Sequence, residues 1–280
     1  MQNFLDNSNK LFKAAKLYFP SAYSGFKNQK LWDDLETFCL FLGYPRSGHS
    51  LIGALLNAHP MVAMSHESAA LKYVYLGFSR NQIYDLILKK ASLSPERKLG
   101  GYTYFVPNQS QGQIKKLKVI GDKQGEGTVL RIAESDRYIE RLRQILNIKI
   151  KFIHIVRNPY DNIATISRKT PKLGFDIERS IEHYFYLCKV ISDFKFTLDD
   201  EELIEFKQEN FIDEPKVFLK SICDFLGIEA SKKYLDDCQK IVYKSPNKSR
   251  YQVSWTPQLI DLVADNIQKF SFLQGYSYDV

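Results

Sequence analysis

Residues 38–60 read FCLFLGYPRSGHSLIGALLNAHP, and this stretch predicts a strand, a tight loop and a helix in succession. The apolar run over residues 37–42 is short and nearly unbroken, which is typical of a strand buried on both faces of a parallel sheet. A glycine follows at position 43, and beyond the loop apolar residues recur at helical spacing: Leu51, Ile52, Leu55, Leu56 and Ala58. The loop therefore ends at a helix N-terminus, where unpaired backbone N–H groups bind anions.

The loop has the spacing Gly-x-x-x-x-Gly-His-Ser, which is that of a phosphate-binding P-loop with one difference. His49 stands where that motif has the lysine that serves the transferring phosphate of ATP. Arg46 is the only cation left in this loop, and its planar guanidinium suits an oxyanion. A turn that binds nothing remains an alternative. The predicted anion ligands are Arg46 and the backbone N–H groups of Ser47, Gly48, His49 and Ser50.

Length and composition indicate one globular domain. The chain has 280 residues, of which 44% are hydrophobic, enough for one sizeable core. We predict a single domain over residues 1–280, with residues 1–35 as an irregular, aromatic-rich lead-in packed on it. The formal net charge of +7 fits an enzyme for polyanionic small molecules, but it would also fit a weak nucleic-acid or membrane-surface binder.

The cysteines and the N-terminal segment bear on metal content and compartment. Residues 1–32 contain neither a long apolar run nor a small-residue cleavage site, so no signal peptide or membrane anchor is expected. The histidines form no cluster with the cysteines, so we expect no metal. We therefore expect a cytoplasmic protein without stable membrane insertion and leave its oligomeric state open. The cysteines expected to be buried free thiols are Cys39, Cys188, Cys223 and Cys238.

Strands and helices are predicted to alternate along the rest of the chain. Further strands are expected at residues 61–64, 117–120, 149–156 and 203–206. Helices are expected at residues 83–91, 128–146, 161–168, 177–191, 215–226 and 257–275. This order predicts an α/β fold, with a P-loop-like, three-layer α/β/α arrangement around a central parallel sheet.

Charged residues follow three of the predicted strands, at the edge where open α/β sheets bind ligands. His66 and Glu67 follow the strand at 61–64, and Lys123 follows the strand at 117–120. A solvated helix start is the alternative for Glu67, and an exposed loop lysine is the alternative for Lys123. Arg157 follows the strand at 149–156, with Thr165 on the next helix. Two anion sites predict a ligand with two separated phosphates.

The two motifs together resemble those of the sulfotransferases that use 3′-phosphoadenosine 5′-phosphosulfate (PAPS). Pro-Arg-Ser-Gly-x-Ser after the first strand is similar to their 5′-phosphosulfate loop. Val-Arg-Asn-Pro-x-Asp-x-x-x-Thr after a later strand is similar to their 3′-phosphate motif. The resemblance extends from about residue 38 to the C-terminus and is strongest to the bacterial and tyrosylprotein-type branch. It implies transfer of a sulfuryl group to an acceptor hydroxyl, or less readily an amine, with adenosine 3′,5′-bisphosphate (PAP) as product.

The resemblance also implies roles for individual residues. Glu67 matches the glutamate that acts as base in this branch, and His66 remains an alternative base. Lys123 lies in a Gly-Asp-Lys element whose lysine faces the sulfuryl group in bacterial members. Lys248 and Arg250 lie in a segment that resembles the basic loop that closes over the nucleotide.

These matches define a scheme for the reaction and leave two other classes open. Arg46 and residues 47–50 would hold the 5′-phosphosulfate, while Arg157 and Thr165 would hold the 3′-phosphate. Glu67, with a raised pKa, would remove the acceptor's proton, and protein cations would neutralise charge without a metal. A P-loop kinase or ATPase, and a non-catalytic nucleotide or polyanion binder, are the alternatives.

Two parts of the ligand contacts are not predicted. Relatives usually have a tyrosine where this chain has Gln208, so the residue that contacts adenine stays open. The acceptor can be a small molecule, a carbohydrate, a lipid or a peptide, and we expect no nucleic-acid partner. Residues 72–116 are expected to carry acceptor specificity, because insertions of this kind often do.

Overall fold

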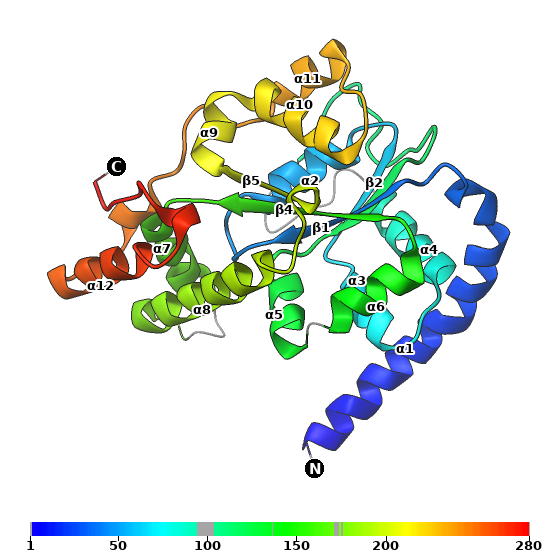
Figure 1. Cartoon of the computed structure of the whole chain (residues 1–280), viewed down its shortest axis with the longest axis horizontal. Helices are drawn as coiled ribbons and strands as arrows, with labels where there is room; N and C mark the ends of the chain where they lie inside the picture. Colours follow the sequence, from blue (N-terminus) through cyan, green and yellow to red (C-terminus); the bar gives the residue numbers. More distant parts are fainter. Residues whose placement is uncertain (1, 94–103, 136, 171–173, 175, 280) are drawn as a thin grey trace.

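The computed structural model describes residues 2–93, 104–135, 137–170, 174 and 176–279, with side chains from residue 15 onward. In this part of the chain five strands form one parallel sheet in the order β2-β3-β1-β4-β5 (Figure 1). The strands are β1 (Thr37–Leu42), β2 (Val62–His66), β3 (Val119–Lys123), β4 (Lys149–Val156) and β5 (Leu203–Lys207).

Helices cover both faces of the sheet, so the predicted three-layer α/β/α fold is confirmed (Figure 1). One face carries α2 (His49–Asn57), α9 (Gln208–Asp213), α10 (Pro215–Leu226) and α11 (Lys232–Gln239). The other carries α3 (Ala70–Tyr75), α4 (Arg80–Ala91), α5 (Glu126–Glu134), α6 (Arg137–Leu146), α7 (Pro159–Lys169), α8 (Ile177–Lys195) and α12 (Pro257–Ile267). The remaining helix, α1 (Gln2–Lys27), packs on α4.

The central strand β1 has the predicted bounds because both of its faces are covered. Phe38 and Leu40 point into the core beneath α3 to α8, while Cys39 and Phe41 point into the core beneath α2 and α10. A strand with no solvated face needs an unbroken apolar run, and residues 37–42 supply it. The predicted bounds of β4 are confirmed as well.

The register of the sheet brings the candidate site residues to one edge. β1 pairs with β3 on one side and with β4 on the other, and the pairs Leu40↔Asp122 and Leu42↔His154 align their carboxyl ends. The loop after β1 therefore lies between the segments that follow β3 and β4. This is the edge at which open α/β sheets bind ligands.

Two predicted segments were wrong. Residues 1–35 are not an irregular lead-in, because α1 covers residues 2–27 and a 3₁₀ turn follows at Gln29–Trp32. Tyr18 packs on Phe78, whereas Phe19, Tyr23 and Phe26 are exposed, so the aromatic residues of this helix do not mark its buried side in the sequence. The helix predicted over residues 128–146 is two helices, because Ser135 adopts an extended conformation (ψ 133°) and ends α5. No glycine or proline marks that break in the sequence.

Smaller differences concern the ends of the chain and the stretch at 72–116. The C-terminal helix α12 ends at Ile267, short of the predicted residue 275, and a 3₁₀ turn follows at Ser271–Leu273. Within residues 72–116, positions 94–103 lie outside the described part. No described helix combines the length and the apolar character needed to cross a membrane. All four cysteines are buried and free, as predicted.

Candidate active site

The loop between β1 and α2 offers a ring of unpaired donors. Arg46 and Gly48 have positive φ angles of 71° and 90°, which turn the chain sharply into the helix. Within the described part of the chain, no acceptor is recorded for the backbone N–H groups of residues 47–50. Four such groups at the start of a nine-residue helix fit an anionic ligand, and the helix dipole favours negative charge there.

The side chain of His49 lies beneath this loop rather than in it. Its ring is buried, and Nε2 is 3.1 Å from the carbonyl oxygen of Leu42. The ring packs so closely against Gly43 and Gly125 that a Cβ at either glycine would come within 2.7 Å of it. Burial lowers the pKa of His49 to about 3, so the ring is neutral. The residue at the P-loop lysine position therefore supports the loop from behind and offers only its backbone N–H to a ligand.

Glu67 and Lys123 meet beside the first turn of α2. Lys123 Nζ lies 2.9 Å from Glu67 Oε1, and the lysine side chain is 5% exposed whereas the carboxylate is 56% exposed. Lys123 Nζ also donates to Ser50 Oγ at 3.3 Å, and His66 Nε2 is 3.3 Å from the same hydroxyl. The structure thus brings together three segments that are separate in the sequence: the first turn of α2 with Ser50, the end of β2 with His66 and Glu67, and the end of β3 with Lys123.

A buried carboxylate fixes the segment that carries Glu67. Asp122 accepts hydrogen bonds from the Ser65 hydroxyl at 2.9 Å, from the Ser68 N–H at 2.8 Å and from the Ala70 N–H at 3.0 Å. These bonds hold the chain on both sides of Glu67, whose own φ is 58°. Asp122 was not predicted to have a role, although it lies in the same Gly-Asp-Lys element as Lys123.

The electrostatics of this cluster differ from the expectation for Glu67. Burial acts to raise the pKa of Glu67, but the charge and hydrogen bond of Lys123, with His66 and Lys90, outweigh it and lower the pKa. The expected raised pKa is therefore wrong for the structure without ligands. Burial and the charge of Lys123 lower the pKa of His66 to about 4, so this imidazole is neutral near pH 7.

Arg157 lies on the other side of the loop and links two segments. Its Nη1 donates to the carbonyl oxygen of Arg46 at 3.1 Å. Its Nη2 donates to the carbonyl oxygen of Asn247 at 2.5 Å and to Ser249 Oγ at 3.2 Å. The guanidinium of Arg46 itself is exposed. Arg157 therefore links the loop between β1 and α2 to the segment predicted to close over the nucleotide.

Arg250 is buried rather than displayed on that segment. Its Nη1 is 3.1 Å from Asp161 Oδ2, and its backbone N–H donates to Asp161 Oδ1 at 2.9 Å. The two side chains are 1% and 3% exposed. Thr165 Oγ1 donates to the carbonyl oxygen of Asp161 at 2.8 Å, and Lys248 is exposed. Of the two cations predicted on this segment, the structure leaves only Lys248 open to solvent.

Two amide side chains contact the loop between β1 and α2, and neither contact was predicted from the sequence. Asn162 on α7 donates to the Pro45 carbonyl at 2.7 Å and accepts from Ser47 Oγ at 3.1 Å. Gln208, at the start of α9, lies against Gly48, where a Cβ would come within 2.7 Å of its Nε2. Asn162 stands at an unspecified position of the quoted motif over residues 156–165, and its place between Asp161 and Thr165 is the one sequence signal that could have identified it.

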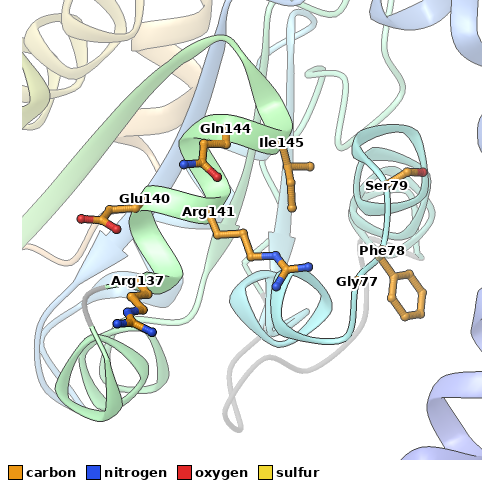
Figure 2. Close-up of a pocket in the computed structure, with 8 residues that line it drawn as sticks. All are labelled: Gly77, Phe78, Ser79, Arg137, Glu140, Arg141, Gln144 and Ile145. Carbon is orange, nitrogen blue, oxygen red and sulfur yellow. The ribbon is translucent and has the colours of Figure 1, made fainter.

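A surface pocket of about 650 Å³ lies apart from these residues (Figure 2). Figure 2 shows Arg137 and Arg141 of α6 on one side and the turn of Gly77 to Ser79 before α4 on the other. None of the predicted site residues lines it. Among the described residues, no three His, Cys, Asp or Glu side chains are grouped as a metal site would require.

Comparison with known proteins identifies the family. The sequence pattern of the sulfotransferase family matches residues 40–232. A sulfotransferase domain from the Synechococcus PCC 7002 olefin synthase has a TM-score of 0.53 and 16% identity, over 84% of this chain and 94% of that one. A sulfotransferase domain from the curacin biosynthetic pathway has a TM-score of 0.52 and 14% identity, over 85% and 98%.

A third solved structure, sulfotransferase STF9 from Mycobacterium avium, has a TM-score of 0.50 and 12% identity, over 90% of this chain and 81% of that one. These likenesses show a shared fold. No curated protein matches the chain. The family match covers more than half of the chain and does not favour the P-loop kinase alternative. The protein therefore belongs to the sulfotransferase family.

Proposed function

We propose that the chain transfers the sulfuryl group of PAPS to an acceptor hydroxyl, with Glu67 as the general base. The observation that carries this proposal is the 2.9 Å contact between Glu67 and Lys123 beside the unpaired N–H groups of residues 47–50. A half-exposed carboxylate can reach an incoming hydroxyl, while the buried lysine can reach a group held by the loop. The other acidic side chain beside Lys123, Asp122, is buried and accepts hydrogen bonds from Ser65, Ser68 and Ala70, so it is not free to take a proton from an acceptor.

In the proposed step the acceptor oxygen forms a bond to sulfur while the bond from sulfur to the bridging oxygen of the donor breaks. Glu67 takes the proton of the acceptor hydroxyl, and the electron pair of the broken bond goes to the leaving phosphate. Lys123 and Arg46 stabilise the negative charge that develops on the bridging oxygen and that phosphate. These protein cations fill the charge-neutralising role, so the scheme includes no metal.

The lowered pKa of Glu67 is compatible with this role because Lys123 is the main cause of the lowering. When Lys123 turns its charge toward a bound donor, it shares its hydrogen bonds between the donor and Glu67. Lys123 then lowers the pKa of Glu67 less, and burial raises this pKa. The carboxylate becomes a stronger base once the donor is in place.

Donor anchoring is assigned to both sides of the loop. The N–H groups of residues 47–50 and Arg46 would hold the 5′-phosphosulfate, and Arg157 with Thr165 would hold the 3′-phosphate. Lys248 would approach the nucleotide from the surface, whereas Arg250 would act through Asp161 by holding its segment in place. Fixing the donor at both ends makes attack at sulfur effectively intramolecular, which can lower a barrier by roughly 7–11 kcal/mol.

The acceptor and the compartment are assigned more broadly. A hydroxyl is preferred to an amine because a carboxylate base suits deprotonation of a neutral O–H. Small molecules, carbohydrates and lipids all remain acceptor classes, to be screened with labelled PAPS. The four buried free thiols support the cytoplasm as the compartment, because a reducing environment keeps cysteines unpaired.

Substitution of the base tests the proposal. Glu67→Gln should lower kcat by about 10²–10⁴-fold, because the amide cannot accept the proton. The rise in Tm caused by PAP should be unchanged. Glu36→Gln is the matched control, since Glu36 is 57% exposed and pairs with Lys118 at the same 2.9 Å. If Glu67→Gln lost PAP binding and turnover equally, its role would be structural.

The donor assignment has a separate test. PAP should raise the Tm more than ATP with magnesium does, since only PAP carries a 3′-phosphate. Arg157→Ala should weaken PAP far more than adenosine 5′-phosphate. Equal weakening of both nucleotides would remove Arg157 from the 3′-phosphate site and leave it only the loop-fastening role.

A further inference from the structure

The helix α1 carries a stripe of aromatic side chains that the described part of the chain leaves uncovered. Phe19, Tyr23 and Phe26 are 75%, 73% and 67% exposed. Their spacing of four and three residues places them on one side of the helix. In the sequence, Leu5 and Phe12 precede Phe19 and Phe26 at the same seven-residue interval. We call Phe19, Tyr23 and Phe26 the aromatic stripe.

The opposite side of α1 fixes the outward direction of this stripe. Gly25 packs so closely on α4 that a Cβ there would come within 2.6 Å of the Asn81 carbonyl oxygen. Ser24 Oγ donates to Asp85 Oδ2 at 2.6 Å, and Gln82 Nε2 donates to the Tyr18 carbonyl oxygen at 2.9 Å. The helix is therefore held to the body, and Figure 1 shows it at the rim of the molecule.

The segment that bears the stripe is basic. Residues 1–32 contain five lysines, no arginine and a single acidic residue, Asp6. The lysines are Lys10, Lys13, Lys16, Lys27 and Lys30. Lys16, Lys27 and Lys30 are exposed. A helix with aromatic residues on one side and lysines around it has the composition of helices that lie in the surface of an anionic bilayer.

We propose that α1 docks the enzyme on an anionic lipid surface, with the aromatic stripe at the level of the headgroups and the lysines on lipid phosphates. A second copy of the chain fits less well, because each chain carries five lysines in residues 1–32 and a net charge of +7, and two such basic segments would repel each other. A lipid surface offers apolar and anionic contacts together. This binding is additional to sulfuryl transfer and does not depend on it.

Vesicle co-sedimentation of the full chain tests the proposal. The protein should bind phosphatidylcholine vesicles that contain phosphatidylglycerol, and it should bind pure phosphatidylcholine vesicles at least about tenfold more weakly. Phe19→Ser with Phe26→Ser should weaken binding by about tenfold or more, since two aromatic side chains lose their apolar contact. The matched control is Phe196→Ser, an exposed phenylalanine after α8, which should bind unchanged.

Charge reversal gives a second, independent variant that cannot be confused with loss of apolar packing. Lys27→Glu with Lys30→Glu should weaken binding by about tenfold or more, and added salt should weaken the unaltered chain in the same direction. Lys232→Glu, an exposed lysine on α11, is the control.

Three results would overturn the proposal. The first is equal binding to both kinds of vesicle. The second is an equal loss in the stripe variants and in their controls. The third is a dimer in sedimentation velocity that the phenylalanine variant abolishes, without lipid binding by the unaltered chain, because the stripe would then be an interface between two copies. Unchanged Tm values confirm that each variant is folded.

Discussion

The ion pairs on the two sides of the loop between β1 and α2 differ in their exposure to solvent. On the β3 side, buried Lys123 pairs with a Glu67 carboxylate that is 56% exposed. On the β4 side, Arg250 and Asp161 are 1% and 3% exposed and share a second hydrogen bond through the backbone of Arg250. An ion pair with one exposed partner can separate at a small cost in free energy. Removal of one partner from a buried pair instead leaves an unpaired charge in the interior.

This difference indicates that the two sides of the loop have different roles in the proposed reaction. The β4 side is held by contacts within the protein, because Arg157 and Asn162 bind the loop and Asp161 binds Arg250. On the β3 side, the half-exposed carboxylate of Glu67 can accept a hydrogen bond from a further group. In the proposed function, donor anchoring and proton transfer therefore lie on opposite sides of one loop, and each side has the rigidity that its proposed role needs.

The largest effect is expected on the buried pair. Asp161→Ala should lower the free energy of unfolding by about 3–5 kcal/mol, because the Arg250 guanidinium is left buried without its partner. Asp193→Ala, which removes a 59% exposed carboxylate from an i,i+4 pair with Lys189, should cost about 0–1 kcal/mol. Urea unfolding of both variants measures the contrast. Similar losses in the two would show that burial of the Arg250 pair does not matter.

Local sequence patterns predicted those features of the fold that depend on short-range physics. β1 and β4 were found at their predicted bounds because each is a nearly unbroken apolar run. The end of α10 was found as well, since Gly227 takes the left-handed conformation (φ 79°) that favours glycine after a helix. Glu67 and Lys123 were singled out because each follows a predicted strand, and strand ends converge at one edge of a parallel sheet; Lys123 is itself the last residue of β3.

Contacts between distant segments could not be predicted from the sequence. Nothing in residues 244–250 indicates that Arg250 would be buried on Asp161, 89 residues away, rather than displayed beside Lys248. Asp122 likewise gains its function from three groups on the neighbouring strand and the turn after it. A pattern of residue types reveals which face of a helix or strand is apolar, but a polar side chain takes its partner from the tertiary fold.

A smaller effect is expected in the pH dependence of the β3 side. Because Lys123 helps to hold the pKa of Glu67 below its ordinary 4.5, the carboxylate should stay ionised at mildly acidic pH, and the acid limb of kcat/KM should lie below that value. The same lowering contributes stability above the unfolded pKa that is lost as pH falls through the folded pKa. Lys123→Met removes the lowering charge but leaves burial, so the acid limb of the residual activity should move to higher pH.

The pH profile also decides between the two candidate bases. Burial and the charge of Lys123 lower the pKa of His66 to about 4, so a limb from this imidazole would also lie at acid pH. His66→Asn should leave the acid limb of kcat/KM in place, because Glu67 is the proposed base. If the limb vanished in His66→Asn, the imidazole would be the base and Glu67 would lose that role. A limb that did not move in Lys123→Met would contradict the coupling of Lys123 to Glu67.

The smallest effect on stability is expected at Gly53, on the side of α2 that faces Lys123. A Cβ at this position would lie 2.9 Å from Lys123 Cγ and 3.1 Å from Lys123 Cβ, so the lysine must shift. Gly53→Ala should change the free energy of unfolding by no more than about 1 kcal/mol, because the gain in helix propensity offsets the crowding. Its kcat should nevertheless fall by about tenfold or more, since a displaced Lys123 no longer meets the reacting group. In a Lys123→Met background the same substitution should cost no further activity, and a full additional loss there would show that Gly53 acts through some other contact.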